Sequence, residues 1–199
     1  MTKVKICGLS RAADIEAVNY AMPDYIGFVF ANSRRQITPE LAAQLKSRLH
    51  PDIVAVGVFV DAPIAQIKTL VQSGTIGAVQ LHGTEDIQYL RQLALELEAP
   101  ILKAVTVMQK GDAQRWDHSP ASYLLLDNGA GGTGQRFDWD LIGKPDTPYF
   151  LAGGLDAQNV TEAIKRVSPF AVDVSSGVET GGVKDHKKIN TFIRRARNG

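Results

Sequence analysis

Short apolar segments alternate with helical patterns along the whole chain, and this alternation limits the possible fold more than any other feature. Segments such as 53–60 and 123–126 are almost uninterrupted apolar runs, as expected of parallel strands buried on both faces. The segments between them carry apolar residues at helical spacing. Eight strand–helix units of about 25 residues each fill the chain without an evident linker. We therefore predict an α/β fold, a single compact (β/α)8 TIM barrel, in one domain of residues 1–199.

The boundaries of these units follow from turn and capping signals. Helix caps are predicted at Ser10, Thr38, Asp156 and Asp185, where polar side chains precede apolar periodicity. Only a weak helix is expected at 112–117, and at most a single turn at 137–142. The predicted strands are 4–8, 25–30, 53–60, 78–83, 101–105, 123–126, 149–152 and 170–174.

The main alternative architecture is an open doubly wound sheet, which is built from the same units. Eight units without a topological break make it the weaker interpretation. Residues Gly129–Gly134 match the pattern G-x-G-x-x-G of dinucleotide-binding turns. Such a turn follows the first strand and opens a long helix, whereas this one follows the sixth strand and precedes Lys144-Pro145. We therefore reject a dinucleotide site.

The charge distribution excludes several classes of function. The sequence holds 22 Lys and Arg and 21 Asp and Glu, for a net charge of +1, and the basic residues are scattered among the acids. This argues against a nucleic-acid or membrane surface, and nothing indicates an obligatory protein partner. No apolar run is long enough to span a bilayer, and the N-terminus lacks the apolar region of a signal peptide. The one cysteine, Cys7, favours a reducing, cytoplasmic location.

Two glycine turns late in the chain indicate a phosphate pocket. One follows the seventh strand at Gly153-Gly154, and the other follows the eighth at Ser175-Ser176-Gly177. Turns of this composition point backbone N–H groups at an anion, and the last two units of a barrel often share such a site. Taken singly, each turn is equally well explained as an ordinary tight turn.

Reactive groups in barrel enzymes lie at the carboxyl ends of strands, where this chain places several polar residues. Cys7 lies at the end of the first strand, where the positive end of the next helix is expected to lower its pKa and favour a thiolate base, although a free cysteine often only packs. Asp127 is a candidate general acid or a loop cap. Arg35 is a candidate carboxylate ligand or a solvated charge. His82 and Asp173 are candidates for orienting neighbours or satisfying buried backbone groups.

No metal site is predicted, because the four histidines are scattered and no ligand spacing matches zinc. Cys7 also lacks an evident His–Asp relay. What remains is acid–base chemistry on a phosphorylated substrate without a cofactor, which suits an isomerase.

An ordered set of short motifs across nearly the whole chain resembles the phosphoribosylanthranilate isomerase family. Each motif is short, but their order along the chain makes the set specific. The motifs are Val4–Gly8, Gly27–Phe30, Ser33–Arg35, Gly57–Val60, Gln80–Gly83, Phe137–Trp139, Gly153–Leu155 and Asp173–Glu179.

This resemblance implies a cofactor-free Amadori rearrangement of N-(5-phosphoribosyl)anthranilate, a small phosphoribosyl substrate, in tryptophan biosynthesis. It implies that Asp127 is the general acid that opens the ribose ring and Cys7 the general base that removes the C2′ proton. Arg35 would hold the anthranilate carboxylate, and His82 and Asp173 would support the pocket. Backbone N–H groups of Gly153, Gly154, Ser175 and Ser176 would bind phosphate. The stretch 129–134 would close over the substrate.

Two other hypotheses remain at this stage. One is a related phosphoribosyl-sugar isomerase of the histidine pathway, or an enzyme of both substrates; a cysteine after strand one and one evident phosphate pocket argue against it. The other is a non-catalytic barrel that only senses a phosphorylated ligand.

The chain departs from the family pattern in its last loop, 179–185, which lacks a proline that many relatives carry near Gly181 or Gly182. This departure concerns the rigidity of the loop and not the chemistry.

Overall fold

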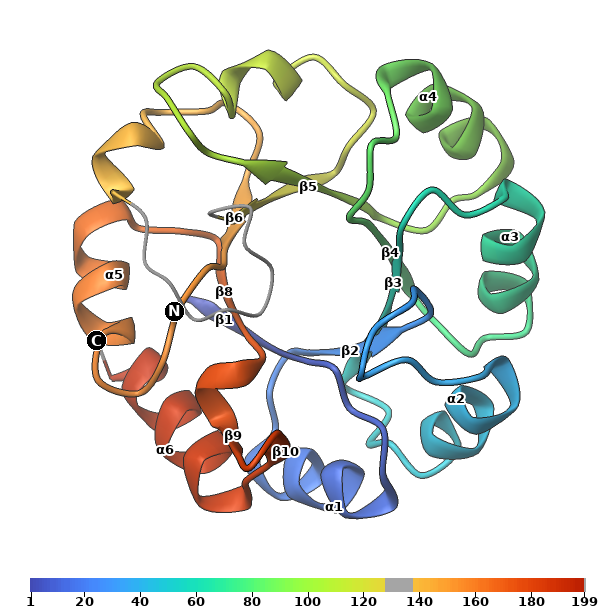
Figure 1. Ribbon diagram of the computed structural model, residues 1–199, viewed down its shortest axis with the longest axis vertical. Helices are drawn as coiled ribbons and strands as arrows, with labels where there is room; N and C mark the ends of the chain where they lie inside the picture. The colour runs from blue at the N-terminus through green and yellow to red at the C-terminus, as the bar shows by residue number, and fades with distance from the viewer. Residues whose placement is uncertain (128–137, 199) are drawn as a thin grey trace.

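Eight parallel strands close into a barrel in chain order, with β8 paired back to β1 (Figure 1). The computed structural model describes residues 1–127 and 138–198. The predicted (β/α)8 barrel is confirmed, and the open doubly wound alternative is wrong. The strands are β1 (Lys3–Cys7), β2 (Tyr25–Val29), β3 (Val54–Phe59), β4 (Ala78–Leu81), β5 (Ile101–Thr106), β6 (Tyr123–Asp127), β7 (Tyr149–Leu151) and β8 (Ala171–Val174).

Helices form an outer ring around the barrel (Figure 1). Among the described residues, the units after β5 and β6 carry only the 3-10 turns η1 (Gln114–Trp116) and η2 (Trp139–Leu141), in agreement with the weak patterns there. A further 3-10 turn, η3 (Ser176–Val178), and a small hairpin of β9 (Glu179–Thr180) and β10 (Val183–Lys184) follow β8. The α-helices are α1 (Ala12–Ala21), α2 (Pro39–Lys46), α3 (Ile64–Gln72), α4 (Ile87–Glu96), α5 (Val160–Val167) and α6 (His186–Arg197).

The helix caps agree only in part with the prediction. The Thr38 side chain accepts a hydrogen bond from the Leu41 N–H at the start of α2, and Asp185 accepts one from Lys187 N–H at the start of α6. Asp156 does not cap α5 directly; its carboxylate accepts from backbone N–H groups in the turn before the helix.

The predicted cap at Ser10 is also wrong, and the observed arrangement affects the site. The carboxylate of Asp14, inside α1, accepts the backbone N–H groups of both Ser10 and Arg11 at 3.0 Å. An internal acid therefore satisfies the start of the helix, which begins at Ala12, five residues beyond Cys7. A helix dipole acts mainly within the first turn, so its positive end is too far away to act strongly on the thiol.

Aromatic side chains close the amino end of the barrel. Phe150 is fully buried inside it and contacts Tyr25, Tyr123 and Phe170, which lie at or just before the starts of their strands. These rings fill the amino end of the barrel interior, as far as the described residues show. No helix among the described residues is long and apolar enough to cross a membrane.

Candidate active site

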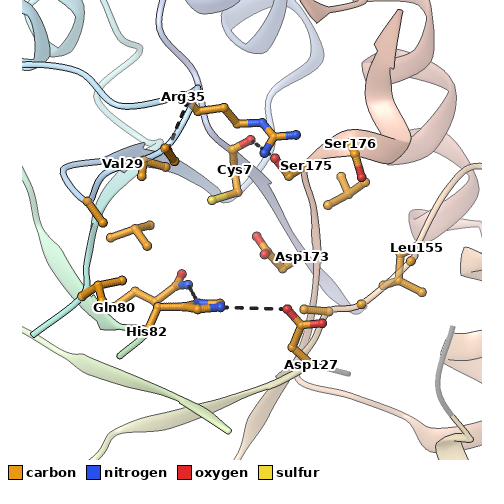
Figure 2. Close-up of a pocket in the computed structure, with 18 of the residues that line it drawn as sticks. Cys7, Val29, Arg35, Gln80, His82, Asp127, Leu155, Asp173, Ser175 and Ser176 are labelled. Atoms are coloured by element: carbon orange, nitrogen blue, oxygen red, sulfur yellow. Dashed lines mark hydrogen bonds and ion pairs between the residues drawn. The ribbon is translucent and has the colours of Figure 1, made fainter. Parts of the chain in front are cut away.

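A pocket lies at the carboxyl end of the barrel, and it gathers all the site residues predicted from the sequence. Figure 2 shows Arg35 and Asp127 on opposite sides of the view, with the Cys7 sulfur and the Asp173 carboxylate between them. The predicted residues that line this pocket are Cys7, Arg35, His82, Asp127, Gly153, Gly154, Asp173, Ser175 and Ser176.

Cys7 ends strand β1, and its sulfur points into the pocket (Figure 2). The neighbouring strand β2 carries Gly27 beside it in the parallel register. A Cβ atom at position 27 would lie 2.6 Å from the Cys7 sulfur, closer than such atoms approach in proteins. Glycine at this position therefore makes room for the thiol.

The pKa of the Cys7 thiol is raised, which corrects the sequence-based expectation of a lowered value. Burial is the main cause, because it disfavours the charged thiolate. The ammonium groups of Lys5 and Lys184 attract the thiolate and lower this pKa, whereas repulsion from the Asp173 carboxylate raises it further. The thiol is therefore mainly protonated at neutral pH, and the thiolate it forms is a stronger base than an exposed one.

A buried ion pair between Lys5 and Asp173 lies next to the Cys7 thiol. Lys5 is fully buried in β1, and its Nζ atom is 2.8 Å from Oδ1 of Asp173 in β8. The two residues are register partners in adjacent strands. Burial lowers the pKa of Lys5, but attraction to Asp173 and to the Cys7 thiolate outweighs it, so the net pKa is raised. The pair therefore places a permanent cation next to the thiol.

His82 follows β4 and faces Asp127 at the end of β6 (Figure 2). Its Nε2 atom lies 4.0 Å from Oδ2 of Asp127, and its Nδ1 atom lies 2.8 Å from the amide nitrogen of Gln80. Burial lowers the pKa of His82, while Asp127 and Asp173 partly offset this effect. His82 is therefore neutral at pH 7, and with Nδ1 accepting from Gln80 its proton is on Nε2, toward Asp127.

The two glycine turns meet at the pocket as predicted. Gly153 and Gly154 adopt left-handed backbone with φ of 78° and 68°, which other residues adopt at a cost. Their N–H groups and that of Ser175 donate to no protein acceptor within the described residues. The buried Asn159 side chain donates to the Gly154 carbonyl at 2.8 Å and fixes the first turn. Unpaired N–H groups in a rigid turn make a site for an anion.

The second turn is held against the first and against β1. A Cβ atom at Gly177 would collide with the carbonyl oxygen of Leu155, so the turns are in direct contact. The Ser175 hydroxyl donates to the Cys7 carbonyl at 3.0 Å, and the Lys184 ammonium donates to the Ser175 carbonyl at 2.9 Å. The candidate phosphate loop is thereby tied to the strand that carries the thiol.

Arg35 enters the pocket from the loop after β2. It pairs with Glu179 on β9, since its Nε atom lies 2.7 Å from Oε1 of that carboxylate and its Nη2 atom 3.0 Å from Oε2. Burial raises the pKa of Glu179, but hydrogen bonds from Arg35 and Lys184 outweigh it, so the net pKa is lowered. Arg35 is thus an ordered side chain, whereas its position in the sequence alone favoured a solvated loop charge.

Comparison with known proteins decides between the remaining hypotheses. A family model described as N-(5'phosphoribosyl)anthranilate (PRA) isomerase matches residues 4–195. The chain belongs to the phosphoribosylanthranilate isomerase family.

Individual members of the family are similar over their full length. The chain is 44% identical to N-(5'-phosphoribosyl)anthranilate isomerase of Endomicrobium trichonymphae, with 100% of both chains covered. It is 45% identical to that of Lactiplantibacillus plantarum, with 98% of this chain and 92% of the relative covered. Among solved structures, phosphoribosyl anthranilate isomerase from Thermus thermophilus shares 31% identity and a TM-score of 0.89, with 99% of each chain covered.

Another similar structure is a phosphoribosyl anthranilate isomerase in complex with reduced 1-(o-carboxyphenylamino)-1-deoxyribulose 5-phosphate. It has a TM-score of 0.84 and 36% identity, and both chains are covered to 100%. This chain is therefore an isomerase of phosphoribosylanthranilate, an enzyme of tryptophan biosynthesis. The family findings favour this reaction over the histidine-pathway and ligand-sensor hypotheses.

Some residues in and around this candidate site were not identified from the sequence. Lys5 had a signal, because a charge two positions before Cys7 in a buried strand must share its face. Glu179 and Lys184 had none, because what ties them to the site is the contact of Glu179 with Arg35, 144 residues away in sequence. The residues missed are Lys5, Gly27, Gln80, Asn159, Glu179 and Lys184.

The predicted closing stretch 129–134 lies outside the described residues. Within the described residues no group of His, Cys, Asp and Glu is arranged to hold a metal ion.

Replacing Gly27 with alanine is expected to reduce isomerase activity by displacing the thiol. The added methyl group needs the space of the Cys7 sulfur, and such overpacking costs about 1–3 kcal/mol of stability. We expect kcat to fall about 10-fold or more at temperatures where the variant remains folded. The matched control is Gly77→Ala, where a Cβ would meet only Val54 Cγ1 at an ordinary 3.5 Å. Equal kcat values for the two variants would contradict this role.

Proposed function

We propose that this isomerase works by general acid–base catalysis, with Asp127 as the acid and Cys7 as the base. The observation that carries the proposal is that both side chains line one pocket, at the ends of β6 and β1, between two candidate anion sites. General acid–base catalysis of this kind contributes about 10²–10⁴-fold to a rate. No cofactor is required by the chemistry proposed for these residues.

The substrate is held at both ends. Its phosphate binds the N–H groups of Gly153, Gly154, Ser175 and Ser176, and its anthranilate carboxylate binds Arg35. This assignment is supported by the unpaired N–H groups of the two turns and by the bound ligand of one relative, which carries a carboxyphenyl group and a phosphate. The lining of the pocket also includes apolar side chains that offer a surface for the aromatic ring; they are Val29, Ala31, Val58 and Val60.

The first chemical step opens the ribose ring. Asp127 donates its proton to the ring oxygen, the bond from that oxygen to C1′ breaks, and the anthranilate nitrogen lone pair forms a C1′=N double bond. The product is a cationic Schiff base with a new hydroxyl group at C4′. His82, neutral and 4.0 Å from Asp127, supports the carboxyl group in this position.

The second step removes the proton from C2′. The Cys7 thiolate takes it, the C–H electrons form a C1′=C2′ double bond, and the C1′=N electrons return to nitrogen to give a neutral enolamine. Protonation at C1′ and loss of the C2′ hydroxyl proton then give the ketone. The Lys5–Asp173 pair keeps a cation beside the thiolate at the moment it forms. The cationic Schiff base also makes the C2′ proton more acidic.

The pH dependence of kcat/KM tests the role of the thiol. A general base must be deprotonated, so activity is lost as the pH falls through its pKa and gained as the pH rises through it. Because Asp127 must also hold its proton, the titration of the base is isolated in Asp127→Asn, which has no acid at this position to titrate. Since burial raises the pKa of Cys7 above its ordinary value near 8.5, we expect the residual kcat/KM of this variant to rise steadily from pH 6.5 to about 8.5. A flat or falling profile over this range would remove Cys7 as the base.

Asp173→Asn, combined with Asp127→Asn, provides a matched variant for this profile. It removes the carboxylate that raises the pKa of Cys7 and releases Lys5 to lower it. The rising limb of kcat/KM is therefore expected to move to lower pH. A limb that stays in place would show that another group titrates.

We further propose that residues 1–199 act as one isomerase domain in the cytoplasm, without a nucleic-acid, membrane or obligatory protein partner. Support comes from the closed barrel that the chain forms, its balanced charge of +1 and its single cysteine.

A further inference from the structure

Three cations converge on one buried carboxylate next to the active site. Glu179 has a side chain only 5% exposed, yet it does not line the substrate pocket. Arg35 binds it through two nitrogen atoms, at 2.7 and 3.0 Å. Lys184 Nζ lies 2.7 Å from Oε1, and Arg34 Nη2 lies 2.7 Å from Oε2. With three cations on one anion, the cluster keeps a net positive charge beside the pocket.

The orientation of Arg35 follows from how its donors are used. A guanidinium group has five N–H donors, one on Nε and two on each Nη atom. The bond from Nε and one bond from Nη2 go to Glu179. The three remaining donors are both N–H groups of Nη1 and the second of Nη2, and these form the edge that binds a carboxylate in bidentate fashion. Glu179 thus occupies one edge of the guanidinium and leaves the other for a ligand.

Two further contacts hold Arg35 in place: Gly8 packs against its aliphatic stem, and Lys184 binds the Glu179 carboxylate to which the guanidinium is paired. A Cβ atom at Gly8 would collide with Arg35 Cδ, so the stem lies directly over that glycine. Lys184, which holds Glu179, also donates to the carbonyl and the hydroxyl oxygen of Ser175 at 2.9 and 3.2 Å. A continuous chain of contacts therefore runs from Arg35 through Glu179 and Lys184 to the loop that is proposed to bind phosphate.

We propose that Glu179 is a positioning residue for the isomerase reaction, which fixes Arg35 so that its free edge receives the carboxylate of the substrate. This inference rests on the proposed role of Arg35. Through Lys184, Glu179 also sets the distance between that carboxylate site and the loop of Ser175. A guanidinium that is already fixed in its binding orientation loses less side-chain freedom when the substrate binds, so the interaction strengthens binding.

Glu179→Gln tests the proposal because it keeps the size of the side chain and removes the charge that orients Arg35. We expect KM to rise about 10-fold and kcat to change less than threefold, since the lost interaction serves substrate binding and transition state alike. Inhibition by inorganic phosphate, which needs no arginine at the carboxylate site, is expected to change less than twofold. A KM within twofold of the wild type, or an equal loss of phosphate binding, would overturn the proposal.

A double-mutant cycle separates positioning from general damage. Arg35→Met is expected to raise KM strongly, and adding Glu179→Gln to it is expected to raise KM no further. Additive effects would show that Glu179 acts independently of Arg35 and would overturn the proposal. If Arg35→Met leaves KM unchanged, the carboxylate assignment of the proposed function fails as well. If Arg35→Met raises KM but Glu179→Gln leaves it normal, the positioning role of Glu179 fails while the carboxylate assignment of Arg35 stands.

Arg34→Gln is the matched control, because Arg34 contacts the same carboxylate but does not line the pocket. Its KM is expected to stay within twofold of the wild type. An increase equal to that of Glu179→Gln would mean that any disturbance of the cluster raises KM, and would overturn a specific role of Glu179 in orienting Arg35. If Glu179→Gln does not fold, Glu179→Asp carries the same test: it keeps the charge that the buried Lys184 needs and draws the carboxylate away from Arg35.

Discussion

Replacing Cys7 with alanine is expected to lower kcat by about 10²–10⁴-fold, because the variant lacks the proposed general base for the C2′ proton. KM is expected to change little, since the proposed phosphate loops and Arg35 remain in place. The measurement is steady-state turnover of N-(5-phosphoribosyl)anthranilate, with thermal unfolding followed by circular dichroism to show that the barrel is intact. Turnover within a few-fold of the wild type would assign the base elsewhere.

The single cysteine allows a second check of the same prediction. Because Cys7 is the one cysteine of the sequence, alkylation of the protein by iodoacetamide reports on this residue alone. The thiolate is the reactive form, so the rate of alkylation is expected to rise with pH up to the raised pKa of the thiol. Bound product should slow it by covering the pocket. An alkylated enzyme with full activity would contradict the role of the thiol.

Replacing Asp127 with asparagine is expected to lower kcat by a similar factor of about 10²–10⁴, for a different reason. The amide keeps the shape of the side chain but cannot give a proton to the ring oxygen, so the furanose does not open at the normal rate. The control is Asp52→Asn, which changes an exposed carboxylate before β3, at the other end of the barrel, and should keep kcat within twofold. Retained activity in Asp127→Asn would move the acid to another group.

The barrel was predictable because its information is local. Apolar runs such as that of β3 and the helical spacing of the segments between strands are visible within short windows of sequence. The strand-end rule then placed Cys7, Asp127 and the two glycine turns at one end of the barrel. These features depend on chain order and periodicity, and the closed topology brings them into one pocket.

The electrostatics of the site were not predictable in the same way. The pKa of Cys7 depends on burial and on Lys5, Asp173 and Lys184, three charges brought to it by different parts of the chain. The sequence suggested a helix dipole as the dominant influence, but the start of α1 is distant and already satisfied by Asp14. Glu179 meets Arg35 across a separation of 144 residues, and no local pattern encodes such a contact.

The fate of the hydrogen at C2′ tests the central claim most directly. Substrate labelled with deuterium at C2′ is mixed with excess enzyme, and loss of the label is followed in a single turnover by mass spectrometry. The account predicts that the wild type releases the label as product forms, and that Cys7→Ala releases it at least about 100-fold more slowly. Release of the label by folded Cys7→Ala at the rate of the wild type would contradict the account.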